Sequence, residues 1–208
     1  MKSILIESQY IGSCSYWKLL LDADTILIDK QEHFVKRSFR NRAHILGANG
    51  LLRLSIPLES GKHQHAAMQD VRISYNQDWQ NLHWHSLTSC YRRSPFFEFY
   101  EDNFRKFYDN KFEFLIEYNT ELLKIIAAIL KADINFTYTE KYIKKEEFAG
   151  TDFRSFILPS TKSVIEFPVY PQVFNDRFDF IKDLSVLDLL FNAGTRSKDY
   201  LEKIVLKF

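Results

Sequence analysis

Hydrophobic and polar positions in the first part of the chain follow the pattern of an α/β fold. Ser3–Glu7 and Thr25–Asp29 are short apolar runs typical of buried strands. Between them, Tyr16–Ala23 predicts a helix with Ser13 or Ser15 as its N-cap. A strand, a helix and a strand this close together form a small βαβ unit, which favours parallel pairing. The loop after the first strand would then lie where open α/β sheets bind ligands.

A β-hairpin is predicted next. Two β-type runs, Arg42–Leu46 and Leu51–Pro57, flank the turn sequence Ala48-Asn49-Gly50. Asn-Gly supplies the positive φ angles that a tight hairpin turn requires. After a polar loop, the alternation of Asp70–Tyr75 predicts a further strand.

The remainder of the chain has mainly helical periodicity. The predicted helices run from Trp79 to about Arg93, from Ser94 to Tyr108, and over Phe112–Ala132, Val186–Phe191 and Ser197–Leu206. Ile134–Thr139 has the composition of a strand, and Ser163–Tyr170 that of an edge strand interrupted by Pro168. The polar segment Lys141–Lys162 is expected to be a mobile loop.

These patterns predict an α/β fold, with a mixed α+β arrangement as the alternative. We expect a Rossmann-like βαβ unit and a hairpin over about residues 1–75, followed by a mostly helical part over residues 76–208. Because no internal repeat or clean linker interrupts the sequence, we expect residues 1–208 to form a single domain.

Composition narrows the class of protein. The 208 residues include 46% hydrophobic and 26% charged residues, as in ordinary globular proteins, and the formal net charge of +1 argues against nucleic-acid binding. Two cysteines, with no metal-binding spacing, indicate a reducing, cytoplasmic environment and no metal site. Without a signal peptide, transmembrane run or cofactor motif, we expect a protein without membrane span or cofactor.

A dense group of cations precedes the hairpin and is the main candidate for ligand binding. Arginine forks are well shaped for the oxygens of phosphates and carboxylates, and Asn41 between two arginines can orient them or cap a turn. An exposed turn with solvated charges is the alternative. The candidate ligand-binding residues are Gln9, Tyr10, Lys36, Arg37, Arg40, Asn41 and Arg42.

His83, Asp29 and Tyr91 are the candidate catalytic residues. The unperturbed pKa of histidine is near neutrality, so His83 is a candidate general base. Tyr91 lies about two helical turns further along the same side, and Asp29 ends the second strand beside the basic segment; either could orient the histidine. A His–Tyr packing pair and a salt-bridged turn are the structural alternatives.

Several motifs, RNR, GANG, SIPL, HW, YRRSPFF and LSVLDLLFNAG, together resemble the WbqC-like protein family from the first strand to about Gly194. That family occurs in bacterial gene clusters for surface polysaccharides of the O-antigen type, so the resemblance implies a role in building surface glycans. The chain departs from the family in its first loop, which lacks the usual proline. After the second strand, the usual acidic pair is reduced to Asp29 and Lys30.

The leading hypothesis is a cytoplasmic enzyme of lipopolysaccharide or related surface-glycan biosynthesis. It would transfer an acyl, aminoacyl or related group to or from a small anionic or nucleotide-linked substrate, such as a sugar nucleotide. Arg40 and Arg42 would bind the anion, Lys36 would add charge and His83 would be the general base. The alternative is a non-catalytic binding or assembly protein, such as a homodimer formed through the aromatic helices.

Overall fold

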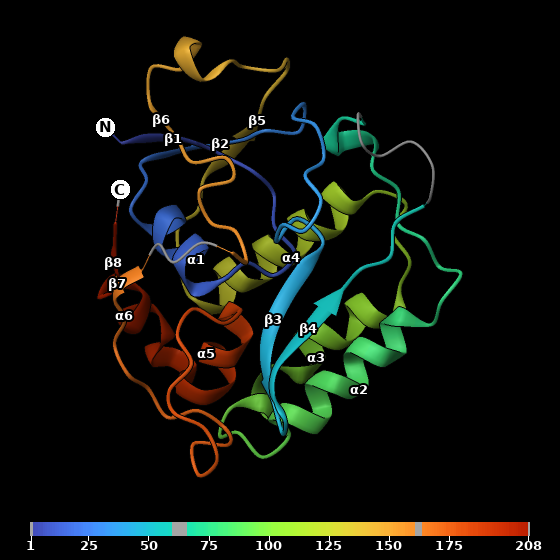
Figure 1. The fold of residues 1–208 in the computed structure, drawn as a ribbon, viewed down its shortest axis with the longest axis vertical. Coiled ribbons are helices and arrows are strands. Elements are labelled where there is room, and N and C mark those ends of the chain that lie inside the picture. The colour runs from blue at the N-terminus through green and yellow to red at the C-terminus, as the bar shows by residue number, and fades with distance from the viewer. Residues whose placement is uncertain (1, 60–65, 161–163, 208) are drawn as a thin grey trace.

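A parallel sheet lies at the centre of the N-terminal part of the structure (Figure 1). The computed structural model describes residues 2–59, 66–160 and 164–207. The sheet has four strands in the order β5-β2-β1-β6, and every neighbouring pair is parallel. The strands are β1 (Ser3–Ile6), β2 (Thr25–Ile28), β5 (Phe136–Tyr138) and β6 (Thr151–Asp152). All four carboxyl ends therefore meet at one edge.

The predicted βαβ unit is confirmed. The residues of β1 pair in register with those of β2, and helix α1 (Cys14–Leu21) connects the two strands. The predicted N-cap is also present, since the Ser13 hydroxyl accepts a hydrogen bond from the Tyr16 backbone N–H at 3.4 Å. This cap satisfies one of the backbone N–H groups that have no partner within the first turn of a helix.

Strands β5 and β6 come from the second half of the chain and lie on opposite sides of the βαβ unit. The chain places β5 beyond β2, and then returns to place β6 beside β1. The prediction of a mobile loop over Lys141–Lys162 is wrong for part of this segment, because β6 pairs with β1 and the 3-10 helix η2 (Lys145–Glu147) precedes it. The last two positions of the segment, 161 and 162, lie outside the described residues. The strand order thus reverses between β1 and β6.

The hairpin is confirmed and consists of β3 (Arg42–Gly47) and β4 (Gly50–Ser55), paired in antiparallel register. Ala48 and Asn49 form the turn between them. The positive φ falls on Gly50, at 100°, and not on Asn49. A glycine in that position accepts the left-handed conformation without a steric penalty.

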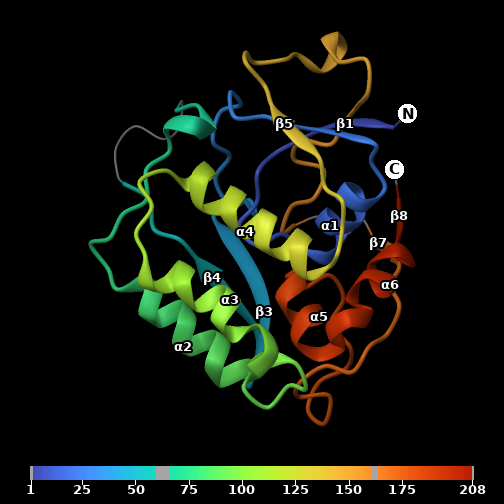
Figure 2. The same ribbon diagram turned by 180° about the vertical axis from the view of Figure 1, so that it is seen from behind.

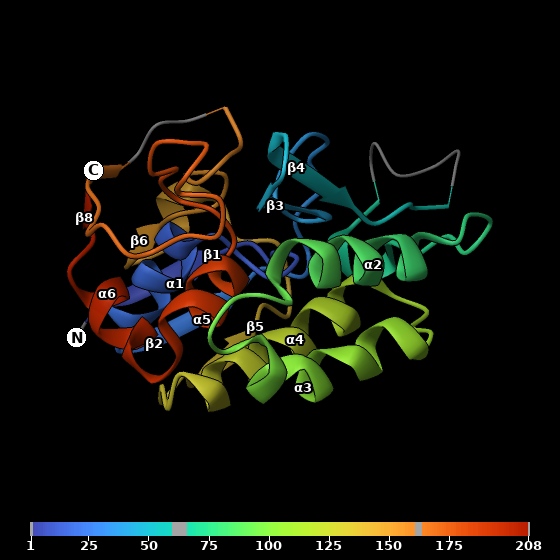
Figure 3. The ribbon, with the colours of Figure 1, turned by 90° about the horizontal axis from the view of Figure 1, so that it is seen from below.

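Helices α2 (Trp79–Tyr91), α3 (Phe97–Asp109) and α4 (Leu115–Ile129) lie side by side, and the hairpin packs against α2 (Figures 2 and 3). Further along the chain, α5 (Val186–Ala193) packs on α1 and α3. The remaining elements are η1 (Met68–Asp70), β7 (Val164–Glu166), η3 (Gly194–Arg196), α6 (Ser197–Glu202) and β8 (Val205–Leu206).

Two predicted elements require correction. The strand predicted over Asp70–Tyr75 is absent, because η1 occupies its start and only isolated bridges, at Arg72 and Ile73, follow. The final helix ends at Glu202, and the residues after it form β8, which pairs antiparallel with β7. The alternation of the first segment thus does not lead to a regular strand, and pairing with β7 gives the end of the second an extended conformation.

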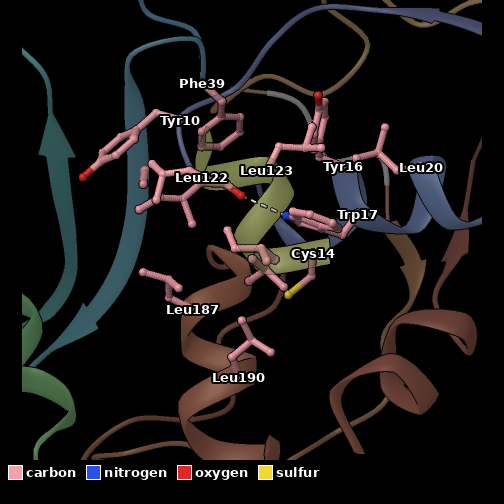
Figure 4. Close-up of a cluster of buried hydrophobic side chains, with 14 of the residues drawn as sticks. Tyr10, Cys14, Tyr16, Trp17, Leu20, Phe39, Leu122, Leu123, Leu187 and Leu190 are labelled. Atoms are coloured by element: carbon pink, nitrogen blue, oxygen red, sulfur yellow. Dashed lines mark hydrogen bonds between the residues drawn. The ribbon is translucent and has the colours of Figure 1, made fainter. Parts of the chain in front are cut away.

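A shared core joins the βαβ unit to the helices (Figure 4). Trp17 on α1 is fully buried, and its indole N–H donates to the carbonyl oxygen of Ile11 at 2.8 Å. Figure 4 shows the leucines of α4 and α5 facing this cluster from the helical side. The residues drawn include Tyr10, Cys14, Tyr16, Phe39, Leu122, Leu123, Leu187 and Leu190.

The fold is α/β, with a parallel sheet, a β-hairpin and a helical C-terminal region, as predicted. The part expected to be mostly helical also supplies two strands of the sheet. That residues 1–208 form a single domain stays a prediction. Within the described residues, no helix is long and apolar enough to cross a membrane.

Candidate functional site

Polar side chains gather at the carboxyl edge of the parallel sheet. Glu7 directly follows β1, Asp29 follows β2, Thr139 follows β5 and Arg154 comes two residues after β6. Ligands of open α/β sheets bind at this edge, at the point where the strand order reverses. In this protein that point lies between β1 and β6.

Asp29 is fully buried and organises this edge. Its Oδ1 accepts hydrogen bonds from the backbone N–H groups of Gln31 and Glu32, at 2.9 and 3.1 Å, and from the Thr139 hydroxyl at 2.7 Å. Its Oδ2 accepts from Nη1 of Arg154 at 2.6 Å. Both oxygens are therefore engaged within the protein, so the geometry makes Asp29 an orienting group for Arg154 and for the loop after β2.

Arg154 is held between two carboxylates. Besides its bond to Asp29, its Nη2 donates to Oδ2 of Asp152 at 2.6 Å, and its guanidinium lies 5.0 Å from the ring centre of Tyr142. Burial lowers the pKa of Arg154, but the hydrogen bonds to Asp152 and Asp29 outweigh burial and raise it above the ordinary value. The cation is fixed in place and charged at every physiological pH.

Glu32 and Arg40 form a bidentate ion pair beside Arg154. Nε and Nη2 of Arg40 donate to the two carboxylate oxygens of Glu32 at 2.7 and 2.6 Å, and Nη2 also donates to the Ser155 hydroxyl at 3.2 Å. Arg40 is fully buried and Glu32 is 5% exposed. Burial raises the pKa of Glu32 to about 7, although the hydrogen bonds from Arg40 act in the opposite direction. Glu32 can therefore exchange a proton near neutral pH.

The end of β1 completes the cluster. Oε1 of Glu7 accepts from the Gln9 side-chain amide at 2.7 Å, and its Oε2 accepts from the Ser155 backbone N–H at 2.9 Å. Ser155 has a φ of 58°, a conformation that non-glycine residues adopt uncommonly and that often marks functional sites. Among the described residues, Oε1 of Gln9 and Nη1 of Arg40 are buried without a hydrogen-bond partner. Such groups indicate unused hydrogen-bonding capacity beside the cluster.

A pocket of about 480 Å³ opens over these groups. Glu32, Arg154 and Ser155 line it from the sheet edge, and the segment around η2 contributes two exposed lysines, Lys144 and Lys145. Cations suited to phosphate or carboxylate oxygens thus lie in the same pocket as a carboxyl group that titrates near neutrality. The other lining residues are His33, Val35, Tyr142, Glu146 and Asp152.

His83, a predicted catalytic residue, lies elsewhere, in a buried neutral network. Its Nε2 accepts from the Ser55 backbone N–H at 3.1 Å, which places its proton on Nδ1, 3.0 Å from the Tyr10 hydroxyl. The Tyr10 hydroxyl is in turn 3.0 Å from that of Tyr108. Burial lowers the pKa of His83 to about 4. The imidazole is therefore neutral at physiological pH, and both of its nitrogens are engaged.

Tyr91 belongs to a third network. Its hydroxyl donates to Oδ1 of Asp188 at 2.8 Å and accepts from the Leu46 backbone N–H at 3.2 Å. Asp188 also accepts from the Tyr170 hydroxyl at 2.6 Å and from the Gln172 amide at 3.0 Å. These bonds tie α2 to α5 and to the segment before α5. The structure thus places the three predicted catalytic residues in three separate networks, and their catalytic roles stay predictions.

The predicted ligand-binding residues also separate. Gln9 and Arg40 belong to the carboxyl-edge cluster, whereas Tyr10 belongs to the His83 network. The Asn41 side chain donates to the Ile56 carbonyl at 2.8 Å, a structural contact between the start of β3 and the end of β4. Lys36 and Arg37 are exposed, and Arg42 is half-buried at the start of β3. The four cations of the basic segment therefore do not form one group.

The sequence reasoning missed Arg154, Ser155, Lys144 and Lys145. They lie in the segment expected to be mobile, and the strand that places them there has only two residues. So short a strand shows no alternation that a periodicity search could detect. Glu32 is one of several polar residues that follow β2, and its sequence context does not distinguish it from them. Its pairing with Arg40, eight positions later, carried no local pattern.

The chain was compared with protein-family models, with curated proteins and with solved structures. The model of the WbqC-like protein family matches residues 7–154, a range that begins at Glu7, ends at Arg154 and contains the carboxyl-edge cluster except for Ser155. The protein named "Uncharacterized protein Rv1507c" from Mycobacterium tuberculosis is 25% identical, over 96% of this chain and 97% of the relative. No solved structure matches the chain.

Proposed function

Because this chain belongs to the WbqC-like protein family, we propose that it is a group-transfer enzyme of surface-polysaccharide biosynthesis that works in the cytoplasm. Its substrate would be an activated anionic molecule such as a sugar nucleotide. One observation carries this proposal: the pocket at the carboxyl edge combines Glu32, which titrates near neutrality, with Arg154 and two exposed lysines.

The anionic part of the substrate would bind to the cations of this pocket. Arg154 directs three of its five N–H groups at Asp29 and Asp152, and two N–H groups remain for a ligand. Since those two carboxylates already surround the guanidinium, the positive charges most accessible to a ligand are those of Lys144 and Lys145 at the exposed rim, where Glu146 also lines the pocket. A rigid fork and two adaptable ammonium groups suit the oxygens of a diphosphate.

Glu32 would move the proton. Transfer to a hydroxyl or amine requires a base that removes a proton from the attacking atom, and a base is most effective when its pKa lies near the working pH. Arg40 holds the Glu32 carboxylate in one orientation, while Asp29 does the same for Arg154. In this proposal Arg40 and Asp29 are positioning residues, and Glu32 is the catalytic one.

A second pocket, between β5 and α4, offers room for an acceptor. It measures about 670 Å³ and lies on the β5 side, with the rings of Phe136 and Tyr138 in its wall. Lys30 lines this pocket and Glu32 lines the other, although only two positions separate them in the chain. Aromatic faces are suitable surfaces for a sugar ring. We assign the acceptor to this pocket and the activated donor to the cationic one.

A non-catalytic binding or assembly role is the second candidate function. Three large apolar side chains are exposed on or near the helical layer: Leu51, Leu82 and Phe99, at 55%, 65% and 75%. Leu51 and Leu82 line a shallow pocket between the hairpin turn and α2. These side chains favour a protein contact there, such as the interface of a homodimer.

A screen for ligands that raise the melting temperature tests the enzyme proposal. A ligand that binds only the native state stabilises it by about 2.7 kcal/mol at a hundredfold excess over Kd. We expect a sugar nucleotide to raise the melting temperature of the wild type, and the Lys144→Gln/Lys145→Gln variant to lose most of that shift. The matched control is Lys182→Gln/Lys203→Gln, which changes two exposed lysines outside the pocket.

The role of Glu32 is tested separately with Glu32→Gln. Once a binding sugar nucleotide is found, we expect this variant to bind it but to turn it over about 10²–10⁴-fold more slowly. In the wild type, activity should rise with pH through about 7, because the ionised carboxylate is the base. Turnover by Glu32→Gln at the wild-type rate would contradict the proposal, and so would a nucleotide shift that the double lysine change reduces no more than the Lys182→Gln/Lys203→Gln control does.

A further inference from the structure

The outward face of the hairpin carries a second group of cations. Arg42 pairs with Ser55 across the two strands, and His44 pairs with Arg53, so all four side chains lie on the same face. The intervening positions face the core and are apolar. Of these, Ala43, Ile45 and Leu54 are each at most 3% exposed, whereas Leu52, opposite Ile45, is 37% exposed.

These cations repel one another. Burial and the charges of Arg53 and Arg37 lower the pKa of Arg42, and burial together with Arg53 and Arg42 lowers that of His44. Arg37, from the loop before β3, therefore belongs to the same group. Holding like charges close together costs folding free energy unless an opposite charge offsets it.

No protein carboxylate offsets these charges within the part of the chain that the structure describes. Arg37, Arg42 and Arg53 form no ion pair there, in contrast to Arg40 and Arg154. In addition, Nε of Arg42 is buried without a hydrogen-bond partner. An N–H group in that state costs free energy unless a ligand or solvent accepts its hydrogen bond.

The hairpin cations are distinct from the carboxyl-edge site. None of Arg37, Arg42, His44 and Arg53 lines the pocket over Glu32. Arg40 separates the two groups, since it turns into the core toward Glu32 while its neighbour Arg42 lies on the hairpin face. A ligand on the hairpin would therefore use its own set of side chains.

We propose that Arg37, Arg42 and Arg53 form a binding site for a diphosphate group, with His44 at its margin. Guanidinium forks match phosphate oxygens, and a diphosphate carries enough charge to offset three arginines. A long polyanion fits less well, because the chain as a whole has a formal net charge of only +1. This site goes beyond the proposed transfer reaction and does not depend on it.

Inorganic diphosphate is the probe for the first test. At low ionic strength we expect it to raise the melting temperature of the wild type and to bind in a calorimetric titration. Arg53→Gln, at an exposed position, and Arg42→Gln should each weaken binding at least tenfold. The Lys144→Gln/Lys145→Gln variant should bind inorganic diphosphate at the hairpin as the wild type does.

The same variants test the repulsion argument without any ligand. Arg53→Gln removes a repelling charge, so in anion-free buffer its melting temperature should equal or exceed that of the wild type. A lower melting temperature would show that Arg53 stabilises the fold, and would overturn the proposal. So would diphosphate binding that is lost in the double lysine variant, or that survives both arginine changes when the two lysines are also replaced.

Two further ligands identify the source of the group. A nucleoside diphosphate that binds with at least the affinity of inorganic diphosphate, and that depends on Arg53 in the same way, supports an esterified ligand. Weaker binding by the nucleoside diphosphate supports free diphosphate. Tighter binding of a single-stranded DNA oligonucleotide, with a steep dependence on salt, would overturn the proposal in favour of a polyanion surface.

Discussion

The carboxyl-edge cluster and the His83 network are both buried and polar, yet they differ in every property that matters for chemistry. Glu32 and Arg154 are charged groups that line a pocket, and each is held by a buried ion-pair partner, Arg40 or Asp29. Tyr10 and His83 are neutral and donate and accept within the core. Burial of a titratable side chain is thus a poor guide to function, whereas access to a pocket is a better one.

The direction of the pKa shifts separates the two regions further. Burial raises the pKa of Glu32 to about 7 and lowers that of His83 to about 4. Burial therefore moves the pKa of an acid toward neutral pH and the pKa of a base away from it. Only the acid can exchange protons readily at physiological pH.

The largest effect is expected from Arg40→Met. This change leaves the Glu32 carboxylate buried without its partner, and breaking such a pair costs about 3–5 kcal/mol. Unfolding in urea at pH 7.5 measures the loss. Lys36→Met is the matched control and should leave the free energy of unfolding nearly unchanged, since Lys36 is exposed. If Arg40→Met were as stable as the control, the ion pair would not hold the edge together.

Next in size is the pH dependence that His83 imposes. Its folded pKa of about 4 lies below the unfolded value near 6.5, so its contribution is complete above pH 6.5 and is lost as the pH falls toward 4. The loss amounts to about 3 kcal/mol. Urea unfolding of the wild type and of His83→Gln between pH 4 and 7 gives the difference in their free energies of unfolding at each pH. His85→Gln, at an exposed position, is the control. Parallel curves would show that His83 is not held neutral.

The contribution of Glu32 to the free energy of unfolding should change with pH in the opposite direction, over nearly the same pH range. Its folded pKa lies above the unfolded one, so its contribution is complete below about pH 4.5 and is lost as the pH rises to about 7. The size is at most about 3 kcal/mol, because Arg40 compensates part of the charge. Comparing the wild type with Glu32→Gln across this range isolates the effect. If the free energy of unfolding of the wild type instead increased with pH relative to that of Glu32→Gln, the carboxyl group would lie in an environment that favours its charged form.

The smallest effect is expected from Tyr10→Phe, which removes the hydroxyl between His83 and Tyr108. Loss of a buried hydrogen-bonding group should cost about 1–3 kcal/mol. Ligand binding at the carboxyl edge should be unchanged, because Tyr10 does not line that pocket. Chemical denaturation measures the loss of stability, and a melting-temperature screen of the same sample measures ligand binding. A selective loss of ligand binding would join the two regions and weaken the distinction between them.

Much of the fold was predictable because it depends on local patterns. The N-cap at Ser13, the hairpin around Gly50 and the helical period of α4 depend on residues close together in the chain. The candidate site was less predictable. Asp29 and Arg40 were identified as candidate residues, but neither Arg154 nor the pairing of Arg40 with Glu32 was predicted. An ion pair across more than a hundred positions, as between Asp29 and Arg154, leaves no periodic signal.

Local order of apolar and polar residues therefore settled the βαβ unit, the hairpin and the helices, since each of these follows from interactions within one or two neighbouring segments. Only the tertiary structure decided that β6 pairs with β1 and brings Arg154 to Asp29. It alone also decided that Arg40 turns inward to Glu32 while Arg42 stays on the hairpin face. Parallel pairing and burial depend on distant parts of the chain, and they determine which charges are neutralised and which remain for a ligand.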